Sequence, residues 1–108
     1  MDAKDTLSAR RFSYEKMQKV SLLETERMFA DVYCLEPGQE QKVHKHDGAD
    51  KVYFVLEGTG HFRIGDEERD LGPNQIVLAA AGTGHGVRNG GAEKLALLVF
   101  MAPNPNKR

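Results

Sequence analysis

Hydrophobic residues in this chain recur in short segments that begin roughly every ten residues, a spacing typical of strands in all-β domains. The segments are rich in β-branched and aromatic residues, and Gly, Pro or Asn lies between them. We predict a strand at each of these segments: 27–35, 42–46, 51–57, 61–64, 76–81, 85–88 and 94–101. The pattern predicts an all-β sandwich or barrel.

Three segments carry no strand prediction. Residues 1–11 are polar and mixed in charge, so we predict an N-terminal arm that precedes a single domain over residues 12–108. The segment SLLETER, 21–27, is expected to be a loop between strands, and GDEERD, 65–70, is expected to be a solvated hairpin turn. A chain of 108 residues is long enough for one hydrophobic core and no more.

Two of the predicted strands, 51–57 and 94–101, are apolar on both faces. In the first of them Tyr53 and Val55 share one face, and apolar residues also fill the other. A strand with one wet face would alternate apolar and polar residues, so both faces of these strands are expected to be covered. The cover is either a second sheet or a partner subunit, and we predict a homodimer.

The composition narrows the set of partners. The net charge is -1, and no basic cluster of the kind that binds nucleic acid is present. Residues 1–13 lack the apolar core of a signal peptide, and the longest apolar run, Leu95–Ala102, is much shorter than the roughly 18 residues of a membrane-spanning helix. Cys34 is the single cysteine, so no internal disulfide forms. We therefore predict a cytoplasmic protein without nucleic-acid or membrane partners.

Three of the four histidines form a candidate metal site. His44 and His46 are two residues apart, so on a strand they project from the same face. His85 opens another predicted strand and is the candidate for a third ligand. Neutral imidazoles held together in this way suit Fe, Mn, Ni, Zn or Cu. The competing interpretation is that these histidines are surface polar residues beside turns, and the fourth, His61, has no assigned role.

Two motifs place these histidines in a wider pattern. The segment 38–58 contains a glycine, five residues, H-x-H, and a closing glycine at Gly58. The segment 74–89 ends with Gly82, His85 and Asn89, spaced as in G-(x)2-H-(x)3-N. These motifs resemble the two motifs of the cupin family, and the resemblance covers about residues 28–103.

The resemblance implies a fold and a cofactor. It implies a single cupin domain, a double-stranded β-helix or jelly-roll barrel of two antiparallel sheets. It also implies a divalent metal held by the motif histidines in the mouth of the barrel, and frequent homodimers. Asn74 and Ala80 stand where the second motif has Gly and Pro, and both substitutions are expected to alter only a turn.

The third departure from the family pattern bears on the chemistry, because Lys51 stands where the first motif has a glutamate ligand. Alternation along the strand places Lys51 inward with Tyr53, and a nearby ammonium would repel a divalent ion. Four outcomes are open. Lys51 loses its proton, it turns away from the ion, Asp47 or Asp50 supplies a carboxylate, or the histidines and Lys51 bind an anion without a metal.

Three functions fit these residues. The first is a metal-dependent enzyme, an oxygenase, isomerase or decarboxylase, that acts on a small anionic molecule. In this hypothesis His44, His46 and His85 hold the ion, and Lys51 and Tyr53 are the candidate substrate-binding residues. The second is a non-catalytic barrel that binds or senses a small molecule, with or without a metal. The third is a structural dimer that binds no ligand. The sequence does not choose the metal, the substrate or the reaction.

Overall fold

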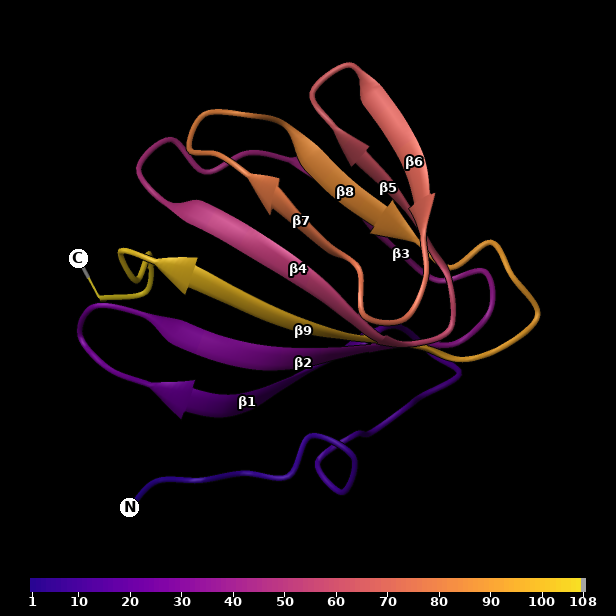
Figure 1. Cartoon of the computed structure of the whole chain (residues 1–108), viewed down its shortest axis with the longest axis horizontal. Helices are drawn as coiled ribbons and strands as arrows, with labels where there is room; N and C mark the ends of the chain where they lie inside the picture. The colour runs from indigo at the N-terminus through magenta and orange to yellow at the C-terminus, as the bar shows by residue number, and fades with distance from the viewer. Residues whose placement is uncertain (108) are drawn as a thin grey trace.

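The computed structural model describes residues 1–107, whose strands form two antiparallel sheets that face each other (Figure 1). The five-stranded sheet has the order β1 (Gln18–Glu24), β2 (Phe29–Leu35), β9 (Leu95–Ala102), β4 (Asp50–Glu57), β7 (Ile76–Ala79). The four-stranded sheet has the order β3 (Glu40–His44), β8 (His85–Arg88), β5 (Gly60–Ile64), β6 (Glu67–Leu71). The predicted all-β class with two antiparallel sheets is confirmed. Within these described residues, no helix combines the length and the apolar character that crossing a membrane requires.

Two strands of the structure lie where no strand was predicted, and each has a physical reason. β1 occupies most of the segment expected to be a loop, and its pairing with β2 shifts between Ser21 and Leu23. This irregularity breaks the alternation of apolar and polar residues by which a strand is recognised. β6 is exposed at every position except Leu71, and it pairs with β5 along its whole length. Its strand conformation comes from backbone pairing with β5, which leaves no hydrophobic pattern in the sequence.

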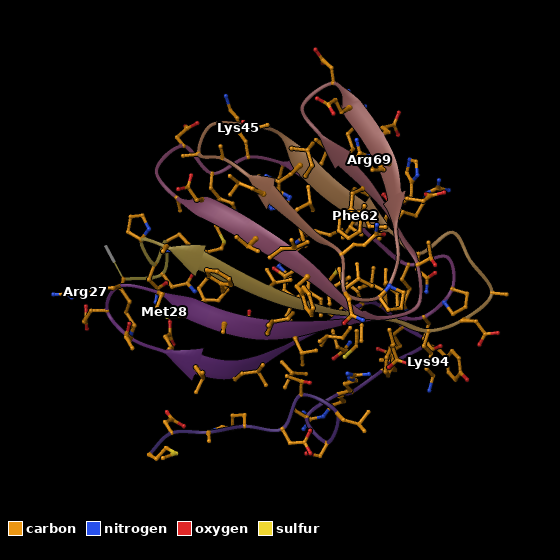
Figure 2. The ribbon with its side chains drawn as sticks, viewed as in Figure 1. Arg27, Met28, Lys45, Phe62, Arg69 and Lys94 are labelled. Atoms are coloured by element: carbon orange, nitrogen blue, oxygen red, sulfur yellow. The ribbon has the colours of Figure 1, made fainter. Side chains whose placement is uncertain are left out.

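The hydrophobic core fills the space between the two sheets. On β4 the side chains of Lys51, Tyr53 and Val55 are buried, whereas the alternate positions are partly exposed. The predicted inward direction of Lys51 is therefore confirmed. The core is made of residues from both sheets, including Phe62 of β5, which Figure 2 labels: Tyr33, Leu35, Tyr53, Val55, Phe62, Leu71, Val87, Leu95, Leu97 and Val99.

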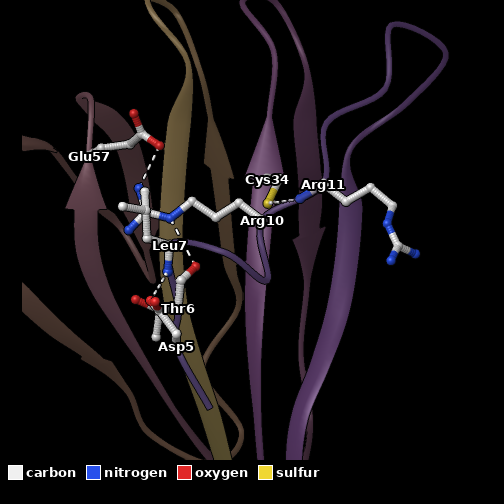
Figure 3. Close-up of polar contacts among 7 residues, drawn as sticks. All are labelled: Asp5, Thr6, Leu7, Arg10, Arg11, Cys34 and Glu57. Atoms are coloured by element: carbon white, nitrogen blue, oxygen red, sulfur yellow. Dashed lines mark hydrogen bonds and ion pairs between the residues drawn. The ribbon is translucent and has the colours of Figure 1, made fainter.

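The segment before β1 is attached to the outer face of the five-stranded sheet. Arg10 forms an ion pair of 2.6 Å with Glu57, and the backbone N–H of Arg11 donates to the buried sulfur of Cys34 (Figure 3). Ala9 and Phe12 pack against a small apolar cluster that includes Cys34. These contacts cover part of the outer face of this sheet, from β1 and β2 to Leu98 of β9 and to Leu56 and Glu57 of β4. The division into an arm over 1–11 and a domain over 12–108 stays a prediction.

Two polar residues of the second motif have structural roles. Asn89 is buried, and its side-chain amide donates to the carbonyl oxygens of Leu35 and Glu93. Asn74, which stands at a glycine position of the motif, has a φ of 71°. Asn tolerates this left-handed conformation better than most residues do. The expectation that this departure concerns only a turn agrees with the backbone at Asn74.

Gly58, which closes the first motif, is required by its surroundings as well as by its backbone. Its φ is 78°, and a Cβ there would overlap the carbonyl oxygen of Lys94. Gly38 also has a positive φ, 87°, but a Cβ there would meet nothing within 4 Å. We expect Gly58→Ala to lower the free energy of unfolding by about 3 kcal/mol, because overpacking adds to the left-handed strain. Gly38→Ala should cost only the strain, about 1 to 2 kcal/mol.

Urea unfolding of both variants measures the difference. Equal losses for Gly58→Ala and Gly38→Ala would show that the Lys94 carbonyl moves aside without cost.

Candidate metal centre

The three histidines converge at one end of the four-stranded sheet. His44 ends β3 and lies opposite His85, which begins β8, and His46 follows two residues after the end of β3. The ring centroids of His44 and His85 are 4.4 Å apart. The centroid of the His46 ring lies 5.1 Å from that of His44 and 5.7 Å from that of His85. One ring nitrogen from each residue lies within 4.8 Å of the other two. The predicted convergence of the three rings is confirmed.

Backbone hydrogen bonds fix the orientation of two of these rings. Nδ1 of His85 donates to the carbonyl oxygen of Thr83 at 2.9 Å, and Nδ1 of His44 donates to that of Lys42 at 2.8 Å. A carbonyl can only accept, so both Nδ1 atoms carry the proton and both Nε2 atoms carry a lone pair. Hydrogen bonding at the other ring nitrogen is the arrangement that metal-binding histidines use.

Burial keeps the His85 and His44 rings neutral. Burial is the largest cause of the lowered pKa of His85, which is about 4. The hydrogen bond to Thr83 raises this pKa, and the charge of Lys51 lowers it. Burial also lowers the pKa of His44, by the same mechanism. Metal ions bind the neutral imidazole, so His85 is in its ligating form at neutral pH and well below it.

The donor set fits a transition-metal ion. Nε2 of His85 is buried and has no hydrogen-bond partner among residues 1–107, an arrangement that costs about 1 to 3 kcal/mol unless something binds there. Nitrogens bound to one ion at about 2.0 to 2.1 Å lie roughly 3 to 3.5 Å apart, so small ring rotations close the cluster on an ion. Within the described chain no carboxylate or thiolate belongs to this cluster.

Lys51 lies against the cluster in a fixed position. Its side chain is 1% exposed, and its Nζ donates to Oε1 of Gln41 at 3.1 Å. Nζ also lies 5.1 Å and 5.0 Å from the ring centroids of Tyr33 and Tyr53. Burial lowers the pKa of Lys51 to about 7, and Lys19 lowers it further, while Asp31 raises it. Partial loss of the proton, one of the four outcomes considered, agrees with this burial.

Neither Asp47, in the turn before β4, nor Asp50, the first residue of β4, takes the place of the missing glutamate. The carboxylate of Asp50 accepts a hydrogen bond from the backbone N–H of Ala81 at 2.9 Å. The carboxylate of Asp47 is exposed and lies 3.9 Å from Nζ of Lys45. The alternative in which one of these aspartates supplies a fourth ligand is therefore not the arrangement in the structure.

A cavity of about 250 Å³ opens beside His44 and His46. Lys51 lines this cavity, but Tyr53 is fully buried and is not part of the cavity wall. The hydroxyl of Tyr53 donates to Oε1 of Gln41 at 2.8 Å. The same oxygen accepts from Lys51, so Tyr53 helps to position Lys51 through Gln41. Direct contact of Tyr53 with a substrate stays a prediction. The cavity wall consists of Lys19, Phe29, Asp31, Tyr33, Gln41, His44, His46, Lys51, Met101, Pro105 and Asn106.

Several polar residues of this wall were missed in the sequence. Asp31 shares a strand face with Tyr33, and Lys19 lies opposite Tyr33 in the pairing of β1 with β2. A charged residue at an inward position of an apolar strand is the signal that could have identified Asp31. Asn106 carries no such signal. It reaches the cavity because Asn104, buried just before it, donates to the carboxylate of Glu24 and to the backbone at the β1–β2 turn.

His61 lies outside the cluster, on the outer side of the four-stranded sheet. Its Nε2 is 2.9 Å from the carboxylate of Glu68, and its Nδ1 is 2.8 Å from that of Asp70. Hydrogen bonds to Glu68 and then to Asp70 raise the pKa of His61. His61 therefore links β5 and β6 across the sheet.

Comparison with known proteins gives matches along most of the chain. The family model of the cupin domain matches residues 31–101. Among solved structures, the protein TT1209 of Thermus thermophilus has 48% sequence identity and a TM-score of 0.95, and the match covers 97% of this chain and 100% of that one. An RmlC-like cupin protein from Desulfovibrio desulfuricans has 29% identity and a TM-score of 0.85, over 96% and 98% of the two chains.

One curated relative has a name that mentions a ligand. The oxalate-binding protein of Thermotoga maritima is 27% identical over 85 residues, which cover 79% of this chain and 69% of that protein.

Proposed function

The chain belongs to the cupin family, and from this premise we propose that it binds one divalent transition-metal ion through His44, His46 and His85. The ion's remaining positions bind a small anionic molecule in the adjacent cavity. The observation that carries this proposal is the buried Nε2 of His85, which has a lone pair and no hydrogen-bond partner in the described chain, within 4.8 Å of two further ring nitrogens.

The residues around the cluster have distinct parts in this function. A bound ion with open positions supplies Lewis acidity to an oxygen of the ligand. Lys51 places a positively polarised donor beside it, and Gln41 fixes Lys51 and Tyr53 through one carbonyl oxygen. The carbonyls of Lys42 and Thr83 hold two imidazoles in the ligating tautomer. Lys51 is nearly inaccessible to solvent, so its donor acts in surroundings of low dielectric constant.

Catalysis and simple binding both use this arrangement. Oxygenase, isomerase and decarboxylase reactions remain the enzymatic candidates, since each uses a metal-bound small molecule. The alternative is a non-catalytic barrel in the cytoplasm that binds or senses an anion. The name of the Thermotoga maritima relative, an oxalate-binding protein, supports a small carboxylate as the ligand and supports binding as the minimal function.

Metal uptake tests the proposal. We expect tag-free protein that has been dialysed against Fe, Mn, Ni, Zn or Cu salts and then freed of excess ion to retain about one ion per chain. Elemental analysis by mass spectrometry measures the ratio. Retention below about 0.1 ion per chain for all five metals would contradict the proposal, because structural and catalytic sites of this kind bind far more tightly.

We also propose a homodimer formed through the outer face of the five-stranded sheet. In the register of this sheet, Val52 lies between Leu78 and Phe100, which form one apolar row. Ile76, Leu78 and Phe100 are 63%, 54% and 39% exposed. An apolar sheet face of this kind marks an interaction site in a soluble domain. The outer face of the four-stranded sheet is charged instead, with Glu40, Arg88, His61 and Asp70 in one row.

The dimer proposal predicts the mass of the particle in solution. We expect light scattering after size exclusion to give twice the chain mass of 12.0 kDa. Leu78→Lys with Phe100→Lys should give the single-chain mass, because two ammonium groups would be buried in an apolar contact. Arg63→Ala, on the other sheet, is the control and should leave the mass unchanged. A single-chain mass for the unaltered protein at about 100 μM would contradict the proposal, since obligate dimers are far tighter.

A further inference from the structure

We infer that the cavity beside the histidine cluster selects a small hydroxycarboxylate, and that Asp31 accepts the hydrogen bond of its hydroxyl group. This inference rests on the proposed function, and it names the chemical class of the ligand. It depends on the balance of donors and acceptors that the cavity wall presents.

One side of the cavity presents positive charge. Nζ of Lys51 lies 5.1 Å from the ring centroid of Tyr33, and Nζ of Lys19 lies 5.3 Å from the same centroid. Both lysines belong to the cavity wall. Lys51 is 1% exposed and donates to Gln41, so it contributes mainly its charge to the cavity wall, whereas the ammonium group of the exposed Lys19 is open to a ligand. Two lysine side chains at one aromatic ring, Lys19 charged and Lys51 charged in part of the molecules, form a site for a carboxylate next to the proposed metal site.

The charged acceptor in the described cavity wall is Asp31. It is the only acidic residue of the cavity wall as described, and its carboxylate makes no hydrogen bond or ion pair with any of residues 1–107. It is half-buried on β2, and burial raises its pKa, while the charge of Lys19 lowers it. The charges of Lys19 and Lys51 act on this carboxylate, but no residue of 1–107 donates a hydrogen bond to it, so a ligand that brings a donor fits this position.

The charges of Lys19 and Lys51 determine which type of donor group can bind beside Asp31. An ammonium group, as in an amino acid, would bond to Asp31 but would be repelled by Lys19 and Lys51. A hydroxyl group donates without a charge. Acetate has no donor and leaves Asp31 unpaired, and oxalate would place a second acceptor against it. A hydroxycarboxylate therefore satisfies both the lysines and Asp31.

The size of the cavity agrees with a small acid. Its volume of about 250 Å³ is on the order of eight times the 30 Å³ that one water molecule occupies in the liquid. Glycolate fits with several waters. Pro105 and Asn106 belong to the wall, so the C-terminal segment encloses the ligand on one side.

Glycolate and acetate form the matched pair of probes, since they differ by one hydroxyl group. NMR titrations of zinc-loaded and zinc-free protein give the ratio of the two dissociation constants. We expect the unaltered protein to bind glycolate more tightly than acetate, and Asp31→Ala to reduce this ratio by roughly tenfold. Asp31→Asn keeps an acceptor and should reduce it by less. Acetate binding should not weaken in either variant, because a negative charge is removed.

The controls separate this inference from the function on which it rests. Zinc also gains from the glycolate hydroxyl, but this gain is the same in all variants, so the change on substitution reports Asp31 alone. Asp47→Ala removes an exposed acid outside the cavity and should change nothing. An unchanged ratio in Asp31→Ala would overturn the inference. Failure to retain zinc would instead contradict the proposed metal site, and the ratio in zinc-free protein would still decide the role of Asp31.

Discussion

Replacing His85 with alanine is expected to weaken metal binding by about 100-fold or more. Loss of a group that merely orients a ligand costs 10- to 100-fold in affinity, and loss of the ligand itself costs at least the upper end of that range. His85 is the most buried of the three histidines, and the bond from its Nδ1 to Thr83 holds its Nε2 in place for the ion. Titration of the metal-free protein with each ion measures the change.

The fold itself should survive the His85→Ala change. In the unaltered protein the buried Nε2 of His85 has no hydrogen-bond partner in the described chain, which costs free energy of folding. Removal of the ring removes this cost, although it also removes some packing contacts. An excess of ion, at about 100 times its dissociation constant, should stabilise the unaltered protein by about 2.7 kcal/mol. The same ion concentration should stabilise the variant by about 0.4 kcal/mol or less. His61→Ala, which alters a histidine outside the cluster, should retain full metal binding. Undiminished binding by folded His85→Ala would show that His85 is not a ligand.

Lys51→Glu is expected to change metal affinity in the opposite direction, by tenfold or more. For a separation of about 5 Å and an effective dielectric constant of about 20, an ammonium repels a divalent ion by roughly 6 to 7 kcal/mol before relaxation and screening. Burial lowers the pKa of Lys51 to about 7, so the lysine is charged in part of the molecules at neutral pH, and only part of this repulsion is recovered. The glutamate would add an anionic ligand in its place.

Lys51→Met separates the two effects. It removes the ammonium without adding a carboxylate, so its metal affinity should lie between those of the unaltered protein and Lys51→Glu. Without metal, Lys51→Glu should be the least stable of the three, because a buried carboxylate then lies beside Tyr33 and Tyr53 without the ion that would bind it. Competition with a metal-sensitive dye gives the affinities, and thermal unfolding gives the stabilities. Weaker or equal binding by both variants would mean that Lys51 does not face the ion.

The sequence was sufficient for the parts of the site that lie on regular strands. Alternation alone placed Lys51 and Tyr53 on the inner face of β4, and the structure has both there. The spacing of His44 and His46, with His85 at the start of another strand, predicted three rings at one place. The prediction for β4 succeeded because the side-chain direction on a strand repeats every two residues. His46 reaches the cluster for another reason, since β3 ends at His44 and the predicted strand 42–46 is shorter than expected at this end.

The remaining parts depend on pairing that the sequence does not display. The register shift between Ser21 and Leu23 breaks the alternation of apolar and polar residues in β1, so neither this strand nor its residue Lys19 was recognised in the sequence. Likewise, β3 and β8 do not pair evenly, since their register shifts between Gln41 and His44. Gln41 could not be recognised as the partner of both Lys51 and Tyr53, because only the packing of β3 over β4 brings its amide to them.

The pairing of His44 with His85 across β3 and β8 has a consequence for how the protein matures. These residues are far apart in the sequence, and nonlocal strand pairs form late because the intervening chain must first be ordered. The newly made polypeptide therefore lacks the assembled histidine cluster, and under the proposed function an ion binds only after the two strands have paired. An ion captured at that stage ties two neighbouring strands together, which should slow their separation and make resistance to proteolysis depend on metal supply during growth.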